Sequence, residues 1–311
     1  MPKPQLWIVA GPTASGKTAV AVELALRVGG EVVSADSMQV YRGMDILTAM
    51  PSAAEMRGVA HHMLAVASPS EKFSAAAYRQ QALACIAEIR RRGKRPIVCG
   101  GTGLYINALT RPLGFAAQGN EAVRAELMHI AGEEGGRTRL HAMLAQVDPA
   151  SAARLHPNDV RRVMRALEIY RLTGRTQTEQ AALDAQRDDA PFDGRIYASE
   201  WPREALYERI DRRVDAMLEA GLVDEVRRLM QNAAEYSTAA QAIGYKEIAA
   251  ALRGECSMEA AIETLKQATR NYAKRQLTWF RRDERVRWVP AQGRTAAEIA
   301  EEIQKDIEAK P

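Results

Sequence analysis

The chain has 311 residues, of which 47% are hydrophobic and 26% charged, a composition typical of soluble globular proteins and not of disordered or membrane proteins. This length fits one large domain or two linked domains. The 43 basic and 39 acidic residues give a net charge of only +4, so the charge balance alone neither requires nor excludes a nucleic-acid partner.

The first predicted elements are a strand, a glycine-rich turn and a helix. Gln5–Ala10 is apolar, and Ala19–Val28 has apolar residues at helical spacing. The turn between them matches the P-loop pattern GxxxxGK[ST] at every fixed position, in the strand-to-helix setting that this motif requires. The predicted diphosphate-binding residues are Gly11, Pro12, Thr13, Ala14, Ser15, Gly16, Lys17 and Thr18.

The chemistry of this turn suits a phosphate ligand. Backbone N–H groups and the helix N-terminus attract phosphate oxygens, Lys17 adds a full charge, and the Thr18 hydroxyl can ligate magnesium. The alternative is a glycine-rich turn with a purely structural role. Since all of these contacts are to oxygens, the loop alone does not distinguish a nucleotide from a prenyl diphosphate.

The next elements alternate between strands and helices. Glu31–Ala35 is a second predicted strand, and the predicted helix Tyr78–Arg91 leads into a third, Pro96–Cys99. Such alternation indicates parallel strands with right-handed crossovers, and therefore an α/β fold with a P-loop NTPase-like, doubly wound sheet. The third strand runs into glycines and lacks the acidic residue with which triphosphatases organise magnesium.

A helical pattern without a convincing strand follows. It predicts an inserted all-helical domain at residues 114–192, within a catalytic core made of residues 1–113 and 193–311. Gly194–Trp201 indicates a return to the sheet, and most of the remainder is helical apart from the short apolar run Val286–Val289.

A carboxylate follows the second predicted strand. Asp36 lies at the edge where parallel α/β sheets bind ligands, so it is predicted to face the diphosphate. The alternative is that Asp36 only caps the segment that follows, as aspartate often does.

Arginines recur on the predicted helix Asp159–Leu172, which is capped by Asn158 and closed by Gly174. Arg161 and Arg165 lie off its apolar face, and like charges at this spacing cost about 0.2 to 0.5 kcal/mol. An anionic partner would explain them; the alternative is a solvated basic surface.

A second basic cluster near the C-terminus is interleaved with aromatic residues, a mixture that can bind phosphates and stack bases. The same aromatic side chains are equally compatible with a core. The cluster consists of Arg270, Lys274, Arg275, Arg281 and Arg282, with Tyr272, Trp279 and Phe280 between them.

Taken in order, the motifs of this chain resemble those of the tRNA dimethylallyltransferase (isopentenyl-tRNA transferase) family. The resemblance covers nearly the whole chain and is to the bacterial type, because the C-terminal zinc-finger Cys/His set of eukaryotic members is absent. The motifs are GPTASGKT at 11–18, DSMQVYRGMDI at 36–46, GVAHH at 58–62, RGKRPIVCGGTGLYINAL at 92–109, LHPNDVRRVMRALEIYRLTG at 155–174, IGYKE at 243–247 and YAKRQLTWFR at 272–281.

The resemblance implies transfer of a dimethylallyl group from dimethylallyl diphosphate, bound with Mg²⁺, to the exocyclic amine of the adenosine 3′-adjacent to the anticodon in tRNAs. The products are isopentenyladenosine and diphosphate. It implies Asp36 as the general base, with Thr13 and Arg213 as further catalytic residues. On the predicted helix Leu206–Gly221, Arg209 and Arg213 lie off the apolar face, and the resemblance favours Arg213 as the diphosphate contact.

The resemblance also implies contacts to the tRNA anticodon stem-loop, with the inserted helices holding the stem. The implied contacts are Asp36, Ser37, Met38, Gln39, Thr102, Arg124, Arg161, Arg162, Val163, Met164, Arg165, Gln241, Ala242, Ile243, Gly244, Tyr245, Lys246, Lys274, Arg275 and Arg281.

Two departures from the family pattern stand outside the proposed chemistry. Met50 occupies a position where lysine is common, and Met63–Val66 lacks a usual aspartate. Two other functions remain open from the residues alone: a small-molecule or nucleotide kinase, and an RNA-binding module with a regulatory P-loop.

Further expectations concern the setting of the protein. No apolar run is long enough to span a bilayer and no targeting signal precedes Leu6–Ala10, which predicts a cytoplasmic protein. Cys85, Cys99 and Cys256 form no CxxC pair and are expected to be inert thiols. The adjacent pair His61–His62 has no third ligand, which favours a structural role over a metal site. Without a heptad pattern, a monomer is expected.

Overall fold

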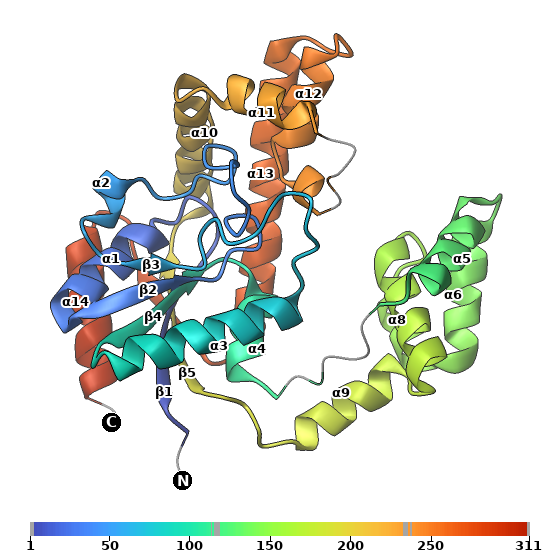
Figure 1. The fold of residues 1–311 in the computed structure, drawn as a ribbon, viewed down its shortest axis with the longest axis horizontal. Helices are drawn as coiled ribbons and strands as arrows, with labels where there is room; N and C mark the ends of the chain where they lie inside the picture. The colour runs from blue at the N-terminus through green and yellow to red at the C-terminus, as the bar shows by residue number, and fades with distance from the viewer. Residues whose placement is uncertain (1–2, 113, 115–118, 233–235, 237, 310–311) are drawn as a thin grey trace. The chain divides into compact units, whose positions relative to one another are not determined.

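A computed structural model describes residues 3–112, 114, 119–232, 236 and 238–309 of this chain. The chain divides into two compact units. The first comprises Met1–Thr110 with Pro191–Pro311, and the second comprises Arg111–Ala190. The first unit carries the sheet, and the secondary structure described in the second is helical (Figure 1).

The described part of the first unit contains a six-stranded parallel sheet, which confirms the predicted P-loop-like α/β fold. Its strand order is β3-β2-β4-β1-β5-β6. Strand β3 was not predicted, because two residues are too few to show a periodicity. The strands are β1 Gln5–Ala10, β2 Gly30–Ser34, β3 His61–His62, β4 Arg95–Gly100, β5 Asp193–Glu200 and β6 Val286–Pro290.

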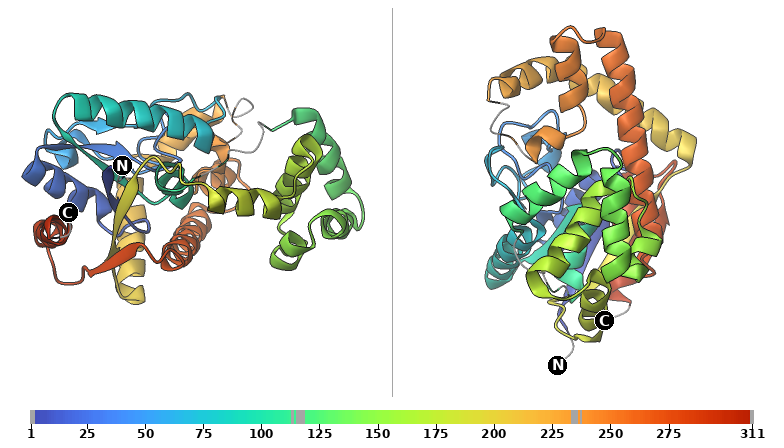
Figure 2. Two further views of the ribbon diagram at one scale, coloured as in Figure 1. Left: turned by 90° about the horizontal axis from the view of Figure 1, so that it is seen from below. Right: turned by 90° about the vertical axis from the view of Figure 1, so that its right-hand side faces the viewer.

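Alternate residues of the strands pack on opposite faces of the sheet, as the period of a strand requires. Leu6 and Ile8 of β1 belong to a core under α3 (Ala75–Arg91) and α4 (Gly103–Thr110), whereas Trp7 and Val9 belong to a second core. The second core lies under α1 (Lys17–Val28) and α14 (Ala296–Glu308). Figure 2 shows α3 and α14 on opposite faces of the sheet.

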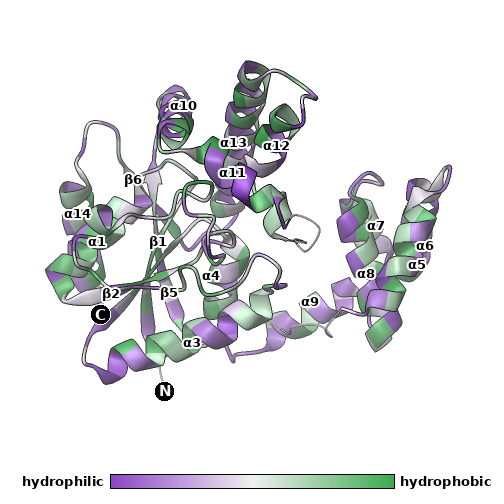
Figure 3. Cartoon of the chain, turned by 45° about the horizontal axis from the view of Figure 1, so that its top comes forward, coloured by the Kyte–Doolittle hydropathy of each residue, from purple (hydrophilic) through white to green (hydrophobic). Residues whose placement is uncertain are grey.

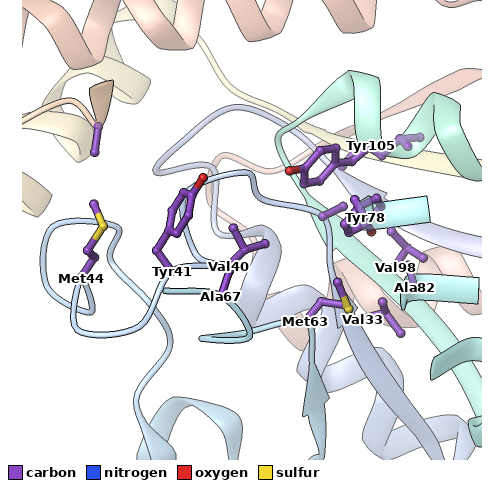
Figure 4. Packing of buried hydrophobic residues seen from close by; sticks show 14 of the residues in the cluster. Val33, Val40, Tyr41, Met44, Met63, Ala67, Tyr78, Ala82, Val98 and Tyr105 are labelled. Atoms are coloured by element: carbon purple, nitrogen blue, oxygen red, sulfur yellow. The ribbon is translucent and has the colours of Figure 1, made fainter. Parts of the chain in front are cut away.

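Stacked aromatic rings join α3 to α4 within the first core. The rings of Tyr78 and Tyr105 are 3.9 Å apart between centroids and 9° from parallel, and they lie beside Val98 of β4 (Figure 4). An aromatic pair typically adds about 0.5 to 1.5 kcal/mol to the burial of the two rings. The pair therefore helps to fix α4, and with it the turn that precedes this helix.

The C-terminal helices pack on one another beside the P-loop. Ala14 of that loop shares a small apolar cluster with Leu206 and Ile210 of α10 and Ala273 of α13. The helices are α10 Arg203–Glu219, α11 Leu222–Met230, α12 Tyr245–Leu252 and α13 Met258–Arg281, with the short helices α2 Ala53–Met56 and η2 Ala239–Gln241.

None of the described helices has both the length and the apolarity that a bilayer crossing requires.

The second unit has its own core, to which α8 contributes Val163 and Leu167. Hydrophilic and hydrophobic residues both occur along α8, as expected of a helix with one buried face (Figure 3). Its N-cap is Asp159, one residue later than predicted, and Gly174 ends it with φ of +68°. The helices are α5 Glu121–Gly132, α6 Gly136–Val147, α7 Pro149–Arg154, α8 Val160–Thr173 and α9 Gln177–Gln186.

A buried carboxylate ties β2 to β3 and to the end of α3. Glu31 is 4% exposed and lies 2.6 Å from Nη2 of Arg92, 2.9 Å from Nζ of Lys94 and 2.7 Å from Nε2 of His62. Burial by itself raises the pKa of Glu31, but hydrogen bonds from Lys94, His62 and Arg92 outweigh it and lower the pKa to about 2. His62 thus has a structural partner, as the sequence predicted.

We expect Glu31→Gln to lower the free energy of unfolding by on the order of 3 kcal/mol near pH 7. The pKa is depressed on folding, so this stabilisation is present above the ordinary carboxyl pKa of 4.5 and is lost as pH falls from there towards about 2. Urea unfolding of both proteins at several pH values between about 7 and 3 measures it. A difference that does not shrink in acid would contradict the assignment. Glu88 is an exposed carboxylate that also pairs with Arg92. Its substitution Glu88→Gln is the control and should change the stability little.

Candidate active site

The turn between β1 and α1 has the backbone geometry of a phosphate-binding loop. Gly11 and Gly16 have φ of +143° and +85°, values that favour glycine. Gly16 directly precedes α1, whose first N–H groups have no helical carbonyl to bind. Lys17 opens the helix, and its Nζ donates to the carbonyl of Pro12 at 3.3 Å. The residues predicted to bind diphosphate therefore form a loop whose geometry suits an anion.

Trp201, the residue after β5, and Arg209 of α10 bind two carbonyl groups of this loop. Nε1 of Trp201 donates to the carbonyl of Ser15 at 3.0 Å, and Nε of Arg209 donates to that of Ala14 at 2.8 Å. The Arg209 guanidinium also lies 4.2 Å from the Trp201 ring centre. With these carbonyls engaged by the protein, the loop can present N–H groups to a ligand.

Asp36 lies in a short turn after β2, and its carboxylate is oriented by that turn. Its Oδ1 accepts the backbone N–H of Met38 at 2.9 Å and that of Gln39 at 3.4 Å. Thr102, from the turn after β4, accepts the N–H of Ser37 at 3.0 Å through its Oγ1. The capping role considered for Asp36 is thus real, and it coexists with a position on the cavity wall.

The segment that follows the Asp36 turn bridges to α10 and α11. Nε2 of Gln39 donates to the carbonyls of Thr48 and Ala49, at 3.3 and 3.2 Å, and Nη2 of Arg213 donates to that of Ala49 at 3.1 Å. The buried carboxylate of Glu225 accepts the N–H groups of residues 46 and 47 at 3.0 and 2.7 Å. The segment is therefore held from three sides.

These elements enclose one cavity of about 240 Å³ within the first unit. The structure thus brings the P-loop and the carboxylate after β2 to a shared space, as predicted from the edge at which parallel strands end. Of the predicted site residues, those that line the cavity are Thr13, Lys17, Thr18, Asp36, Ser37, Met38, Gln39, Arg213, Gln241, Ala242, Ile243 and Arg275.

The charges in this cavity act on one another. Burial, together with the nearby Arg213 guanidinium, lowers the pKa of Lys17, while Asp36 acts in the opposite direction. Burial also lowers the pKa of Arg213, again opposed by Asp36. Lys17, Arg213 and Arg275 beside the single lining carboxylate of Asp36 leave this space electropositive, which suits a diphosphate.

Two uncharged groups complete the wall. Burial raises the pKa of the Cys99 thiol to about 11, so it is neutral near pH 7. Burial raises the pKa of Tyr272 as well, with Asp36 contributing. Cys99 pairs in register with Val9 of the P-loop strand, a position from which a triphosphatase would aim an acidic residue at magnesium.

The oxygen donors of the cavity suit magnesium. Mg²⁺ prefers one or two protein oxygens together with oxygens of its substrate, and the Thr18 hydroxyl and Asp36 carboxylate both line the space. Among the residues that the structure describes, no group of three His, Cys, Asp or Glu side chains is placed to hold a metal. A magnesium ion here would therefore depend on oxygens of the ligand.

In the helical unit, two arginines predicted to contact tRNA converge on one buried carboxylate. Nε of Arg124 and Nη1 of Arg165 lie 2.7 Å from the two oxygens of Glu168, whose side chain is 2% exposed. Burial raises the pKa of Glu168, but hydrogen bonds from Arg165 and Arg124 outweigh it and lower the pKa. The arginines, at 49% and 37% exposure, still face solvent.

The structure corrects part of the predicted RNA surface on α8. Val163 and Met164 are 0% and 8% exposed and pack in the core of the helical unit. Their side chains therefore do not reach an RNA ligand, whereas Arg161 and Arg162 lie on the exposed face of the helix. Five consecutive residues of a helix cannot all share one face.

The predicted tRNA contacts in the C-terminal part of the chain also include both exposed and buried residues. Lys246, Lys274 and Arg281 are exposed and lie outside the cavity wall. Tyr245 is 8% exposed and packs in the main core, which corrects it as a side-chain contact to RNA, and Gly244 beside it is also buried.

The aromatic residues of α13 have three different roles. Phe280 is buried in the core at 2% exposure, Tyr272 lines the cavity and Trp279 is 43% exposed. Of the two roles considered for these aromatic residues, packing in a core holds for Phe280, while Trp279 has an exposed ring. Tyr272 belongs to the cavity wall instead.

Sequence reasoning missed two residues that shape the site, Glu225 and Gln276, and it set Arg209 aside in favour of Arg213. Glu225 lies on the same face of α11 as the buried Leu222 and Val226. Gln276 lies on the buried face of α13, with Ala273 and Phe280 one turn away on either side. A polar residue on an apolar helix face is a signal that could have singled out both.

Comparison with known proteins adds independent evidence on the family of this chain. A family model described as IPP transferase matches residues 39–283. A tRNA dimethylallyltransferase of Geobacter metallireducens is 51% identical over 296 residues, which make up 94% of each protein. Another, from Pelotomaculum thermopropionicum, is 45% identical over 309 residues, or 98% of this chain and 97% of the relative.

Solved structures agree with these sequence matches. The tRNA isopentenylpyrophosphate transferase of Bacillus halodurans aligns with a TM-score of 0.74 and 43% identity, over 99% of this chain and 97% of that one. A eukaryotic dimethylallyltransferase acting on tRNA aligns with a TM-score of 0.81 and 30% identity, over 99% of this chain and 80% of that one.

Proposed function

The chain belongs to the tRNA dimethylallyltransferase family, and we propose that it transfers the dimethylallyl group of dimethylallyl diphosphate to a tRNA adenosine. The acceptor is the exocyclic amine of the adenosine 3′-adjacent to the anticodon, and the products are isopentenyladenosine and diphosphate. One observation carries this assignment to the residues: the carboxylate of Asp36 and the ammonium of Lys17 line the same cavity.

Asp36 supplies the general base in this proposal. An adenine amine is a weak nucleophile, because its lone pair is delocalised into the ring, and it is far too weak an acid to ionise beforehand. Its proton must leave as nitrogen bonds to the allylic carbon, and a positioned carboxylate that accepts it is worth about 10²- to 10⁴-fold in rate. The turn that fixes Oδ1 of Asp36 holds the carboxylate ready for that transfer.

The P-loop and Arg213 receive the leaving group. As the bond between the allylic carbon and oxygen breaks, negative charge grows on diphosphate and is met by fixed donors: the loop N–H groups, Lys17 and Arg213. The side chain of Thr13 lines the same space and is proposed to contact the diphosphate. Thr18, with oxygens of the diphosphate, would hold Mg²⁺, which would neutralise part of that charge.

The residues of β4 count against the alternative function of a kinase. A phosphoryl-transfer site of the P-loop type organises magnesium with an acidic residue, whereas β4 places the neutral Cys99 thiol next to the P-loop strand. Family membership likewise disfavours an RNA-binding module without catalysis.

The decisive experiment is incubation with labelled dimethylallyl diphosphate, Mg²⁺ and unmodified tRNA, followed by nucleoside analysis. Label on the adenosine beside the anticodon supports the proposal, and omission of Mg²⁺ should reduce it. Phosphate transfer from ATP without prenyl transfer would instead identify a kinase. The monomeric state and cytoplasmic location expected from the sequence stay predictions.

The predicted inserted domain, residues 114–192, is proposed to bind the anticodon stem through its arginines. We expect Arg161→Gln to weaken tRNA binding for all accepted tRNAs and to reduce the slope of log affinity against log salt by about 0.7 to 0.9. The reason is the loss of one neutralised phosphate. Filter binding over a range of salt concentrations measures the slope. Arg253→Gln, an exposed arginine paired with Glu255, is the control; equal slopes for all three proteins would remove Arg161 from the RNA surface.

A further inference from the structure

We propose that Gln276 of α13 is a positioning residue for this prenyl transfer, because its side-chain amide locks the P-loop to the turn that supports Asp36. The inference deepens the proposed function and rests on it. Gln276 itself does not line the cavity, so it acts through the residues it holds.

The contacts of Gln276 run in two directions across the centre of the site. Its Oε1 accepts the backbone N–H of Thr13 in the P-loop at 2.9 Å, and its Nε2 donates to the carbonyl of Gly101 at 3.0 Å. Thr13 is 263 positions away in the chain. One side chain thus joins the turn after β1 to the turn after β4.

The second turn continues this link to both neighbours of Asp36. Thr102, the residue after Gly101, donates its N–H to the carbonyl of Ala35 at 3.1 Å. Its Oγ1 accepts the N–H of Ser37 at 3.0 Å. The residues before and after the proposed base are therefore held by Thr102, while Gln276 holds the peptide bond just before Thr102.

The chemistry of this link requires a carboxamide. The Thr13 N–H can only donate and the Gly101 carbonyl can only accept, so the partners themselves determine which way the amide of Gln276 points. Gln276 is 5% exposed, so either group of its amide would be costly to leave buried without a partner. A carboxylate lacks the donor, and an apolar side chain lacks both groups.

The packing at the end of β4 leaves no room for a side chain on Gly100 or Gly101. A Cβ on Gly101 would lie 2.1 Å from Nε2 of Gln276 and 3.0 Å from the carbonyl oxygen of Gly11, and a Cβ on Gly100 would lie 2.2 Å from the carbonyl oxygen of Ala35. Gly100 and Gly101 thus allow the P-loop, the Asp36 turn and α13 to approach one another. This close approach couples the leaving-group site to the base.

Such coupling matters because the reaction depends on alignment. Diphosphate is fixed by the P-loop, and the amine must approach the allylic carbon from the side of Asp36. A misplacement of about 1 Å between reacting groups can cost on the order of 100-fold in rate. Removing the link should therefore act on kcat, whereas tRNA binding, which extends over other surfaces, should change little.

The test compares Gln276→Met, which has a similar size without either polar group, with Gln276→Glu, which keeps the acceptor for Thr13. We expect Gln276→Met to lower kcat about 10- to 100-fold, with KM for tRNA within about 3-fold of wild type. Gln276→Glu should also be slow near pH 8. Its kcat relative to wild type should rise as pH falls, because a protonated carboxyl has one donor and one acceptor, as an amide does.

Gln267→Met is the matched control, since Gln267 lies on the exposed part of the same helix and contacts Arg270 and Asn271. Thermal unfolding and circular dichroism give the folded fraction of each protein. Near-wild-type kcat for folded Gln276→Met would overturn the inference, as would a loss of activity that matches the unfolded fraction alone. If Gln276→Met does not fold, a pH-independent kcat ratio for Gln276→Glu overturns it equally. Failure of the wild-type enzyme to label adenosine would instead refute the proposed function.

Discussion

Asp36→Asn is expected to lower kcat for prenyl transfer by about 10²- to 10⁴-fold, the range attributed to a positioned general base. The amide cannot accept the proton that leaves the adenine amine. It can still accept the N–H groups of Met38 and Gln39 that Oδ1 now binds, so the turn should keep its shape. The affinity for tRNA should therefore stay close to that of the wild type.

Single-turnover kinetics with labelled dimethylallyl diphosphate, together with tRNA binding, separate these effects. Asp224→Asn removes an exposed carboxylate on α11 of the same unit and should leave both quantities unchanged. If Asp36→Asn turned over at the wild-type rate, the base would have to be another group. If tRNA binding failed together with kcat, Asp36 would act chiefly in recognition.

Lys17→Met is expected to lower kcat/KM for dimethylallyl diphosphate by about 10²- to 10³-fold, the loss typical of removing a preorganised donor to developing negative charge. Lys17 begins α1 and faces the cavity with Arg213. Methionine retains much of the length of the side chain and removes its charge. Steady-state kinetics at saturating tRNA measure the effect, and Lys305→Met, a lysine 74% exposed on α14, is the control.

The titration of Lys17 should make kcat/KM for dimethylallyl diphosphate depend on pH. Burial and Arg213 lower the pKa of Lys17 from its ordinary value of 10.5, so as pH rises the free enzyme loses this charge earlier than an exposed lysine would. The kcat/KM for the diphosphate, which reports groups of the free enzyme, should therefore fall in alkali with a midpoint below 10.5. Lys17→Met should lack this limb. A limb unchanged in the variant would assign the titration to another group.

Much of the site could be predicted because its signals are local. The P-loop is a continuous run in which glycines, a lysine and a threonine each have a defined role, and the apolar strand before it fixes its place at the sheet edge. Asp36 follows from the same rule, since parallel strands end at one edge. The arginines of α8 were predicted with less precision: a run of five residues includes the buried Val163 and Met164, because a helix turns through every direction within four residues.

The sequence by itself therefore determined the fold class, the phosphate loop, the base candidate and the family. Only the tertiary structure decided which distant side chains hold these parts together: Arg209 on the loop, Glu225 on the segment around residue 47, and Gln276 between the loop and the turn after β4. The reason is physical. A motif records contacts that a short stretch of chain makes with its ligand, whereas a hydrogen bond across 263 positions arises from how separate helices pack on the sheet, and no local pattern records it.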